Sequence, residues 1–148
     1  MSQALQEEFI RINKWVTEHA QMSYDNGYFI EALQVMHGWI ENKLQELIIL
    51  TGSIDHNSEM SKIWDIANQI NLHSSAKILY ILSQLSENEY QMIVKFNGAR
   101  NEVIHKIYLE PYDKIYQGIP KERYDEVFNI GMKLCELLQA KTERKIEK

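Results

Sequence analysis

An arginine and a histidine with four residues between them, Arg100 and His105, are the side chains of this sequence best suited to chemistry. An imidazole that titrates near neutral pH suits proton transfer. A guanidinium suits a phosphate that gains negative charge in a transition state. Cleavage of RNA by its own 2′-hydroxyl needs these two groups and no metal ion. The pair therefore predicts a site for phosphodiester chemistry.

Polar residues close to the pair extend the predicted site. Apolar residues recur at steps of three and four from Glu87 onward, which is the period of a helix with one buried stripe: Met92, Ile93, Phe96, Ala99, Val103 and Ile107. On such a helix Asn97, Asn101, His105 and Tyr108 share a second face. We predict that Asn101 supports catalysis by orienting the imidazole or by facing a second copy. Asn97 and Tyr108 are predicted to bind substrate.

The two chemical groups do not face the same way on a regular helix. At about 100° per residue, Arg100 and His105 lie about 140° apart. They would converge only if the helix is distorted, or if two copies pair through this face and offer both sets of side chains to one cleft. The second, polar face therefore predicts a homodimer. The plainer alternative is a surface ion-pair arginine and a hydrogen-bonded core or interface histidine.

Short connections divide the chain into the helices that would position this pair. Only six glycines and two prolines occur in 148 residues, which favours long helices. Ser86 and Glu89 predict a capping box at the start of the helix that carries Arg100. Ser74 or Ser75 is the expected cap of the preceding helix, and 51–61 is expected to be a loop. Further helices are predicted over 2–24, 28–50, 61–70, 76–85 and from Pro120 into the C-terminal tail.

These elements predict an all-α fold. We expect an antiparallel, up-and-down four-helix bundle with an additional short helix, in a single domain that spans residues 1–148. The single cysteine, Cys135, falls in the apolar pattern of the last helix and is expected to be a core thiol. His37 and Glu41 are four residues apart and could be two metal ligands or a hydrogen-bonded pair. Because no third ligand is placed near them, we predict neither a metal nor a cofactor.

Charge and hydropathy limit the function classes. The net charge of −5 makes a general nucleic-acid binder unfavourable, so any RNA contact must be local. Residues 100–148 are the least acidic part, with ten Lys and Arg against nine Asp and Glu. The N-terminus lacks a signal-like apolar segment, and no run approaches the length of a membrane span. We therefore expect a soluble, cytoplasmic protein without membrane contact.

The segment from Arg100 to His105 resembles the R-x4-6-H motif of HEPN domains, in the subtype with Asn, Asp or His directly after the arginine. The stretch YDNGYFIEALQVMHGWIENKL is similar to the turn and second helix of that family, where a Gly-aromatic turn precedes an amphipathic helix. Four helices in a chain of this length also match the family. The similarity in pattern spans roughly Phe9 to Tyr108, but only the short motif is specific.

The resemblance implies a homodimeric, metal-independent endoribonuclease with a composite site at the dimer interface. Arg100 would stabilise the scissile phosphate, His105 would be the acid/base group and Asn101 a supporting polar residue. The products would carry 2′,3′-cyclic phosphate and 5′-hydroxyl ends. Such proteins often act in phage defence or as toxins with a cognate antitoxin protein, so RNA and an antitoxin are the implied partners.

The chain departs from the family pattern in the position of the tyrosine that follows His105. Members paired with a nucleotidyltransferase antitoxin often carry a modified tyrosine two residues after the histidine. This chain has Ile107 there, and Tyr108 follows one residue later.

Many members of the family are also non-catalytic. The alternative function is therefore a HEPN-like helical module that binds nucleotide, RNA or protein without turnover.

Overall fold

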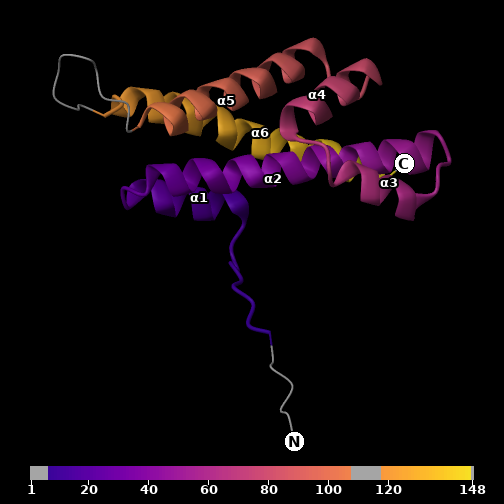
Figure 1. Ribbon diagram of the computed structural model, residues 1–148, viewed down its shortest axis with the longest axis horizontal. Coiled ribbons are helices and arrows are strands. Elements are labelled where there is room, and N and C mark those ends of the chain that lie inside the picture. The colour runs from indigo at the N-terminus through magenta and orange to yellow at the C-terminus, as the bar shows by residue number, and fades with distance from the viewer. Residues whose placement is uncertain (1–6, 108–117, 148) are drawn as a thin grey trace, which may run out of the picture.

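The protein is all-α over the residues that the computed structural model describes, 7–107 and 118–147. This confirms the expected fold class. The elements run in the order α1 (Val16–Asp25), α2 (Phe29–Leu50), a π-helical turn η1 (Thr51–Asp55), α3 (Met60–Ala67), α4 (Leu72–Ile81), α5 (Glu87–Lys106) and α6 (Lys121–Glu147) (Figure 1).

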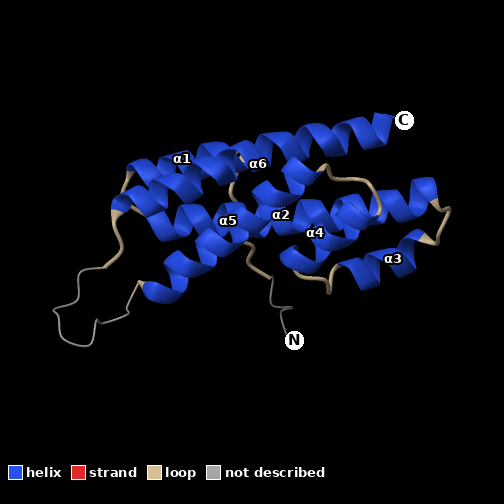
Figure 2. Ribbon diagram, turned by 90° about the horizontal axis from the view of Figure 1, so that it is seen from above, coloured by secondary structure: helices blue, strands red, loops and turns tan. Residues whose placement is uncertain are grey.

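Helix α2 is the centre of the arrangement and packs against all five other α-helices. A tight turn joins α1 to α2, and Gly27 has a φ of 84° there, a left-handed conformation that glycine adopts without steric cost. The two helices consequently lie side by side and antiparallel. Helix α5 packs on α4 and α6, so that α2, α5 and α6 enclose the middle of the core (Figure 2). The largest fully buried side chains include Leu33, Met36, Ile40, Leu44, Ile93, Phe96, Leu134 and Leu138.

The first helix is shorter than its sequence pattern predicted. The described residues before Val16 are not helical, and they run away from the packed helices as an extended arm (Figure 1). Phe9 is 67% exposed and Ile10 97% exposed, so the apolar stripe of the arm has no surface to cover. An isolated helix of this length is marginal in water without tertiary packing, which explains the difference.

Two local predictions were also wrong. The N-cap of α4 is Asn71, whose side chain accepts a hydrogen bond from the Ser74 backbone at 2.8 Å, and not Ser74 or Ser75. Asn71 precedes the first helical residue, which is where a cap must stand to reach a free N–H group. The expected loop after α2 begins with the π-helical turn η1, in which Thr51 donates to the Leu47 carbonyl at 2.7 Å.

The last helix and its cysteine agree with expectation. Helix α6 starts at Lys121, directly after Pro120. Cys135 is fully buried, and burial, followed by the nearby Glu136 carboxylate, raises the pKa of its thiol to about 12. The thiol therefore stays protonated at neutral pH and serves as a core side chain. Among the described helices, none has both the length and the apolar character required to cross a membrane.

Candidate functional site

Helix α5 is fixed in place by its cap and by its apolar stripe. Ser86 and Glu89 form the predicted capping box: the Ser86 N–H donates to the Glu89 carboxylate at 2.7 Å, and the Glu89 N–H donates to the Ser86 hydroxyl at 3.1 Å. Ile93, Phe96 and Val103 are buried on the core side. The cap sets where the helix begins and the buried stripe sets its rotation, so the polar residues between them have defined directions.

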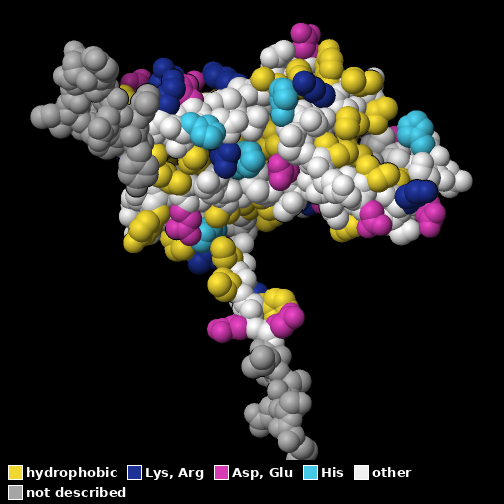
Figure 3. Space-filling view, viewed as in Figure 1, with side chains coloured by type: hydrophobic (Ala, Val, Ile, Leu, Met, Phe, Trp, Pro, Cys, Tyr) yellow, Lys and Arg dark blue, Asp and Glu magenta, His cyan; other side chains and the backbone are white. Residues whose placement is uncertain are grey.

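A polar stripe of α5 meets a polar stripe of α2. On α2 the polar residues recur at steps of three and four, and on α5 they surround the predicted arginine. We call these residues the α2–α5 polar cluster; they are Gln34, His37 and Glu41 of α2 and Asn97, Arg100 and Asn101 of α5. Figure 3 shows histidine, basic and acidic side chains gathered in the middle of the face where these two helices lie side by side. Asn97 and Asn101, two of the four residues of the predicted polar face, thus make contacts within one chain.

Arg100 is held by two amide oxygens within this cluster. It donates to Oδ1 of Asn101 at 2.8 Å and to Oε1 of Gln34. Its Nε atom is buried and reaches no acceptor in the part of the chain that the structure describes. Burial lowers the pKa of Arg100 from its usual value, and the charge of Glu41 opposes that shift. Because an arginine is always protonated in proteins, the cluster presents a held and partly desolvated cation.

His37 is the residue of the cluster whose role the sequence did not predict correctly. Its Nε2 lies 3.2 Å from Oδ1 of Asn97, and its ring stacks on Phe96 with 6.3 Å between the centroids. Burial, and then the positive charge of Arg100, lowers the pKa of His37, while Asn97 and Glu41 act in the opposite direction. The imidazole is therefore neutral at physiological pH. The sequence pattern that could have predicted this role is the recurrence of polar residues along one face of α2, not the four-residue spacing of His37 to Glu41.

The proposed pairing of His37 with Glu41 is wrong. Glu41 instead accepts a hydrogen bond from the Leu72 N–H at 2.9 Å, at the first turn of α4. A carboxylate at a helix N-terminus satisfies a free backbone donor and interacts favourably with the helix dipole. Within the described residues, no three or more His, Cys, Asp or Glu side chains gather as metal ligands.

His105 lies in the last turn of α5 and is exposed to solvent. It makes no hydrogen bond or ion pair with residues 7–107 or 118–147, and it does not join the α2–α5 polar cluster. The structure therefore brings Arg100, Asn101 and Asn97 together within one chain and leaves His105 apart. Tyr108, the other predicted substrate-binding residue, lies outside the described residues.

Comparison with known proteins adds no relative. Neither a family model, nor a curated protein, nor a solved structure matches this chain. The groups available for chemistry at the site are therefore its own. These are a held guanidinium, a neutral half-buried imidazole beside it, and an exposed imidazole further along the same helix.

Proposed function

We propose that the protein is a metal-independent endoribonuclease of the HEPN type, with a composite site formed by two copies of the chain. The observation that supports this most directly is the division of α5 between a held Arg100 and a solvent-facing His105. The guanidinium is already in place to receive a phosphate. The imidazole makes no hydrogen bond or ion pair with the described residues of its own chain. In a dimer it would approach the phosphate bound to the arginine of the opposite copy.

In this proposal the reaction is attack of the RNA 2′-hydroxyl on the adjacent phosphorus. His105 takes the proton of the 2′-hydroxyl, the O2′–P bond forms and the P–O5′ bond breaks. The leaving 5′-oxygen takes a proton from the protonated His105 of the second copy. One copy thus supplies the base and the other supplies the acid. Arg100 stabilises the charge that develops on the phosphate oxygens. The products carry 2′,3′-cyclic phosphate and 5′-hydroxyl ends.

Asn101 has a different role here from orienting the imidazole. Its side-chain oxygen accepts a hydrogen bond from Arg100, so it positions the guanidinium. Gln34 does the same from α2. In the proposed HEPN-like arrangement, α1, α2, α5 and α6 are the four principal helices, and α3 and α4 are additions that lie between α2 and α5 along the chain.

One observation favours a second candidate function. The guanidinium of Arg100 already has two acceptors in its own chain, which is what a purely structural arginine between two helices also needs. A non-catalytic helical module that binds RNA, nucleotide or protein on this face would use the same contacts without turnover. The two candidates differ in one measurable property, the cleavage of RNA.

The test is cleavage of a defined RNA in excess EDTA, with the product ends identified by mass spectrometry. We expect cyclic-phosphate ends from the wild-type protein. His105→Ala removes the acid/base group and should lower the rate by roughly 10²–10⁴-fold. Arg100→Gln should lower it similarly, and Arg100→Lys, which keeps the charge but loses the planar fork, should not restore it.

The matched control is His56→Ala, because His56 is an exposed histidine in the connection after η1 and is far along the chain from α5. It should cleave like the wild type. Circular dichroism melts establish that each variant is folded. RNA that binds to wild-type protein without being cleaved would support the binding module, and full activity of His105→Ala would overturn the proposed mechanism.

A further inference from the structure

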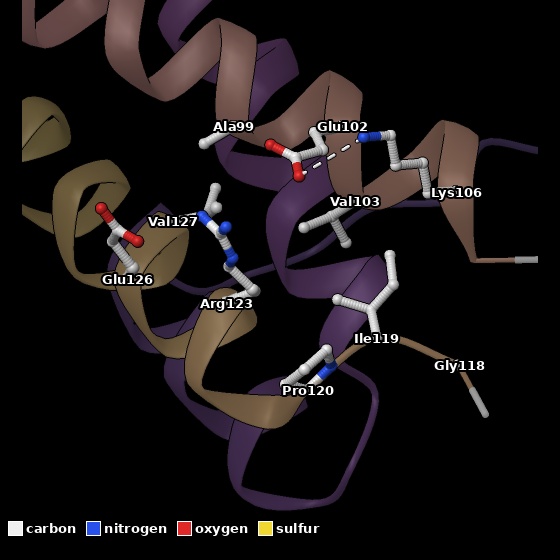
Figure 4. A pocket seen from close by; sticks show the side chains of 10 residues that line it. All are labelled: Ala99, Glu102, Val103, Lys106, Gly118, Ile119, Pro120, Arg123, Glu126 and Val127. Carbon is white, nitrogen blue, oxygen red and sulfur yellow. Dashed lines mark ion pairs between the residues drawn. The ribbon is translucent and has the colours of Figure 1, made fainter.

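A pocket lies on another side of α5, away from the α2–α5 polar cluster. It has a volume of about 380 Å³ and is bounded by α5, the first turns of α6 and the segment 118–120 that leads into α6 (Figure 4). This volume falls within the range of small-molecule sites, roughly 300–1,000 Å³. The pocket shares no lining residue with the cluster, so ligand binding in it can be measured separately from the proposed nuclease activity.

The inner surface of the pocket is apolar. Val103 and Val127 are each 2% exposed, and Ala99, Ile119 and Pro120 complete the apolar lining. Such a surface favours the aliphatic or aromatic part of a ligand, since burying it removes apolar area from water.

The charged residues of the pocket are not all paired. Glu102 lies 3.7 Å from Lys106, and Glu126 lies 3.3 Å from Lys95, so each carboxylate has a cation of its own. Arg123 lines the same pocket and makes no hydrogen bond or ion pair through its side chain within the described ranges. In Figure 4 its side chain extends from α6 toward α5, with Glu102 and Glu126 on either side.

We propose that this pocket binds a small monocarboxylate with an apolar body. The guanidinium of Arg123 offers the planar pair of donors that a carboxylate accepts in bidentate fashion, and the apolar lining takes the remainder of the molecule. A phosphate monoester fits less well. It carries close to two negative charges, and the carboxylates of Glu102 and Glu126 stand beside Arg123.

Three probes with the same ring system test the proposal: naphthalene-2-carboxylate, the uncharged 2-naphthylmethanol and 2-naphthyl phosphate. Binding is followed by methyl NMR of the full chain, with the methyl groups of Val103, Ile119 and Val127 as reporters. We expect the carboxylate to shift these signals and to bind at least about tenfold more tightly than either other probe, as a charge-assisted bidentate pair permits.

Arg123→Gln should weaken carboxylate binding by about tenfold or more and leave the affinity for the alcohol unchanged. Arg123 is exposed, so the variant should fold, and an unchanged methyl spectrum without probe verifies this. Arg144→Gln, an exposed arginine near the end of the same helix, is the control and should bind like the wild type. Equal affinities for carboxylate and alcohol, tighter binding of the phosphate, no methyl shifts, or no effect of Arg123→Gln would each overturn the proposal.

Discussion

At the scale of single residues, two histidines of this protein have opposite surroundings. His37 is half-buried against Phe96 and faces the positive charge of Arg100, whereas His105 is exposed at the end of α5. The first is therefore held neutral, and the second is open to solvent and to a second molecule. This difference is why His105, and not His37, is assigned the acid/base role.

The lowered pKa of His37 predicts a pH-dependent stability. The folded chain binds a proton at His37 less readily than the unfolded chain does, so acidification through the ordinary histidine pKa of about 6.5 favours unfolding. We expect the free energy of unfolding, measured by urea denaturation, to fall between about pH 7.5 and about pH 5.5. His37→Gln, which keeps a hydrogen-bonding group without a titrating one, should reduce that fall.

His56→Gln is the control and should show the wild-type pH profile. Carboxylates contribute in a separate window. The pKa of Glu89 is lowered because hydrogen bonds from Ser86 and Lys141 outweigh the opposing effect of burial, so its stabilisation is lost only at more acidic pH. A His37→Gln profile identical to the wild type between about pH 7.5 and about pH 5.5 would contradict the assignment.

At the scale of elements, Gly131 of α6 lies close to side chains of both α2 and α5. A Cβ atom on Gly131 would lie 2.8 Å from the Phe96 ring and 2.9 Å from the terminal methyl of Met36. A glycine inside a long helix is otherwise unfavourable by about 1 kcal/mol relative to alanine. Its presence here has a packing reason, because the same contacts set the distance between the helix that carries Arg100 and its two neighbours.

Gly131→Ala should therefore destabilise the fold. Overpacking a core costs about 1–3 kcal/mol, and the gain in helix propensity of about 1 kcal/mol offsets part of it, so a net loss of up to about 2 kcal/mol is expected in urea denaturation. Gly38→Ala in α2 is the matched control, since a Cβ there meets no atom within 4 Å. It should stabilise the protein by about 0.5–1 kcal/mol. Stabilisation by both substitutions would show that the core relaxes around the new methyl group.

At the scale of the whole molecule, the proposed site is incomplete in one copy of the chain. Arg100 is turned toward α2, and His105 has no partner among the described residues. The proposed composite site would resolve this, because a two-fold axis would bring the histidine of each copy toward the arginine of the other. The exposed side of α5, which carries His105 and Gly98, is the surface that the proposal places at this axis.

This arrangement predicts complementation between inactive variants. Arg100→Gln and His105→Ala proteins, mixed and allowed to exchange subunits, form dimers that combine one intact arginine with one intact histidine. The mixed dimer lacks the second histidine, which supplies the acid, so we expect partial recovery: the mixture should cleave RNA faster than either variant alone and more slowly than the wild type. Native mass spectrometry of the mixture verifies the exchange. Exchange without recovered activity, or a wild-type protein that is active and monomeric, would count against a composite site.

Much of the local structure was predictable from the sequence. The capping box at Ser86 and Glu89, the extent of α2, the start of α5 and the burial of Cys135 all agree with prediction. Capping and hydrophobic periodicity depend on residues a few positions apart, so they can be recognised without knowing what the helix packs against.

The features that required the tertiary structure involve surfaces far apart along the chain. The sequence marked a second polar face on α5, but only packing decided that α2 covers half of it, placing Gln34 and His37 beside Arg100 and Asn97. Packing also decided that the arm before Val16 has no surface to cover, and that Arg123 lines a pocket against α5. The sequence of a helix determines which residue types lie on each of its faces. Which other helix packs against a face depends on how all the helices of the chain bury their apolar faces together.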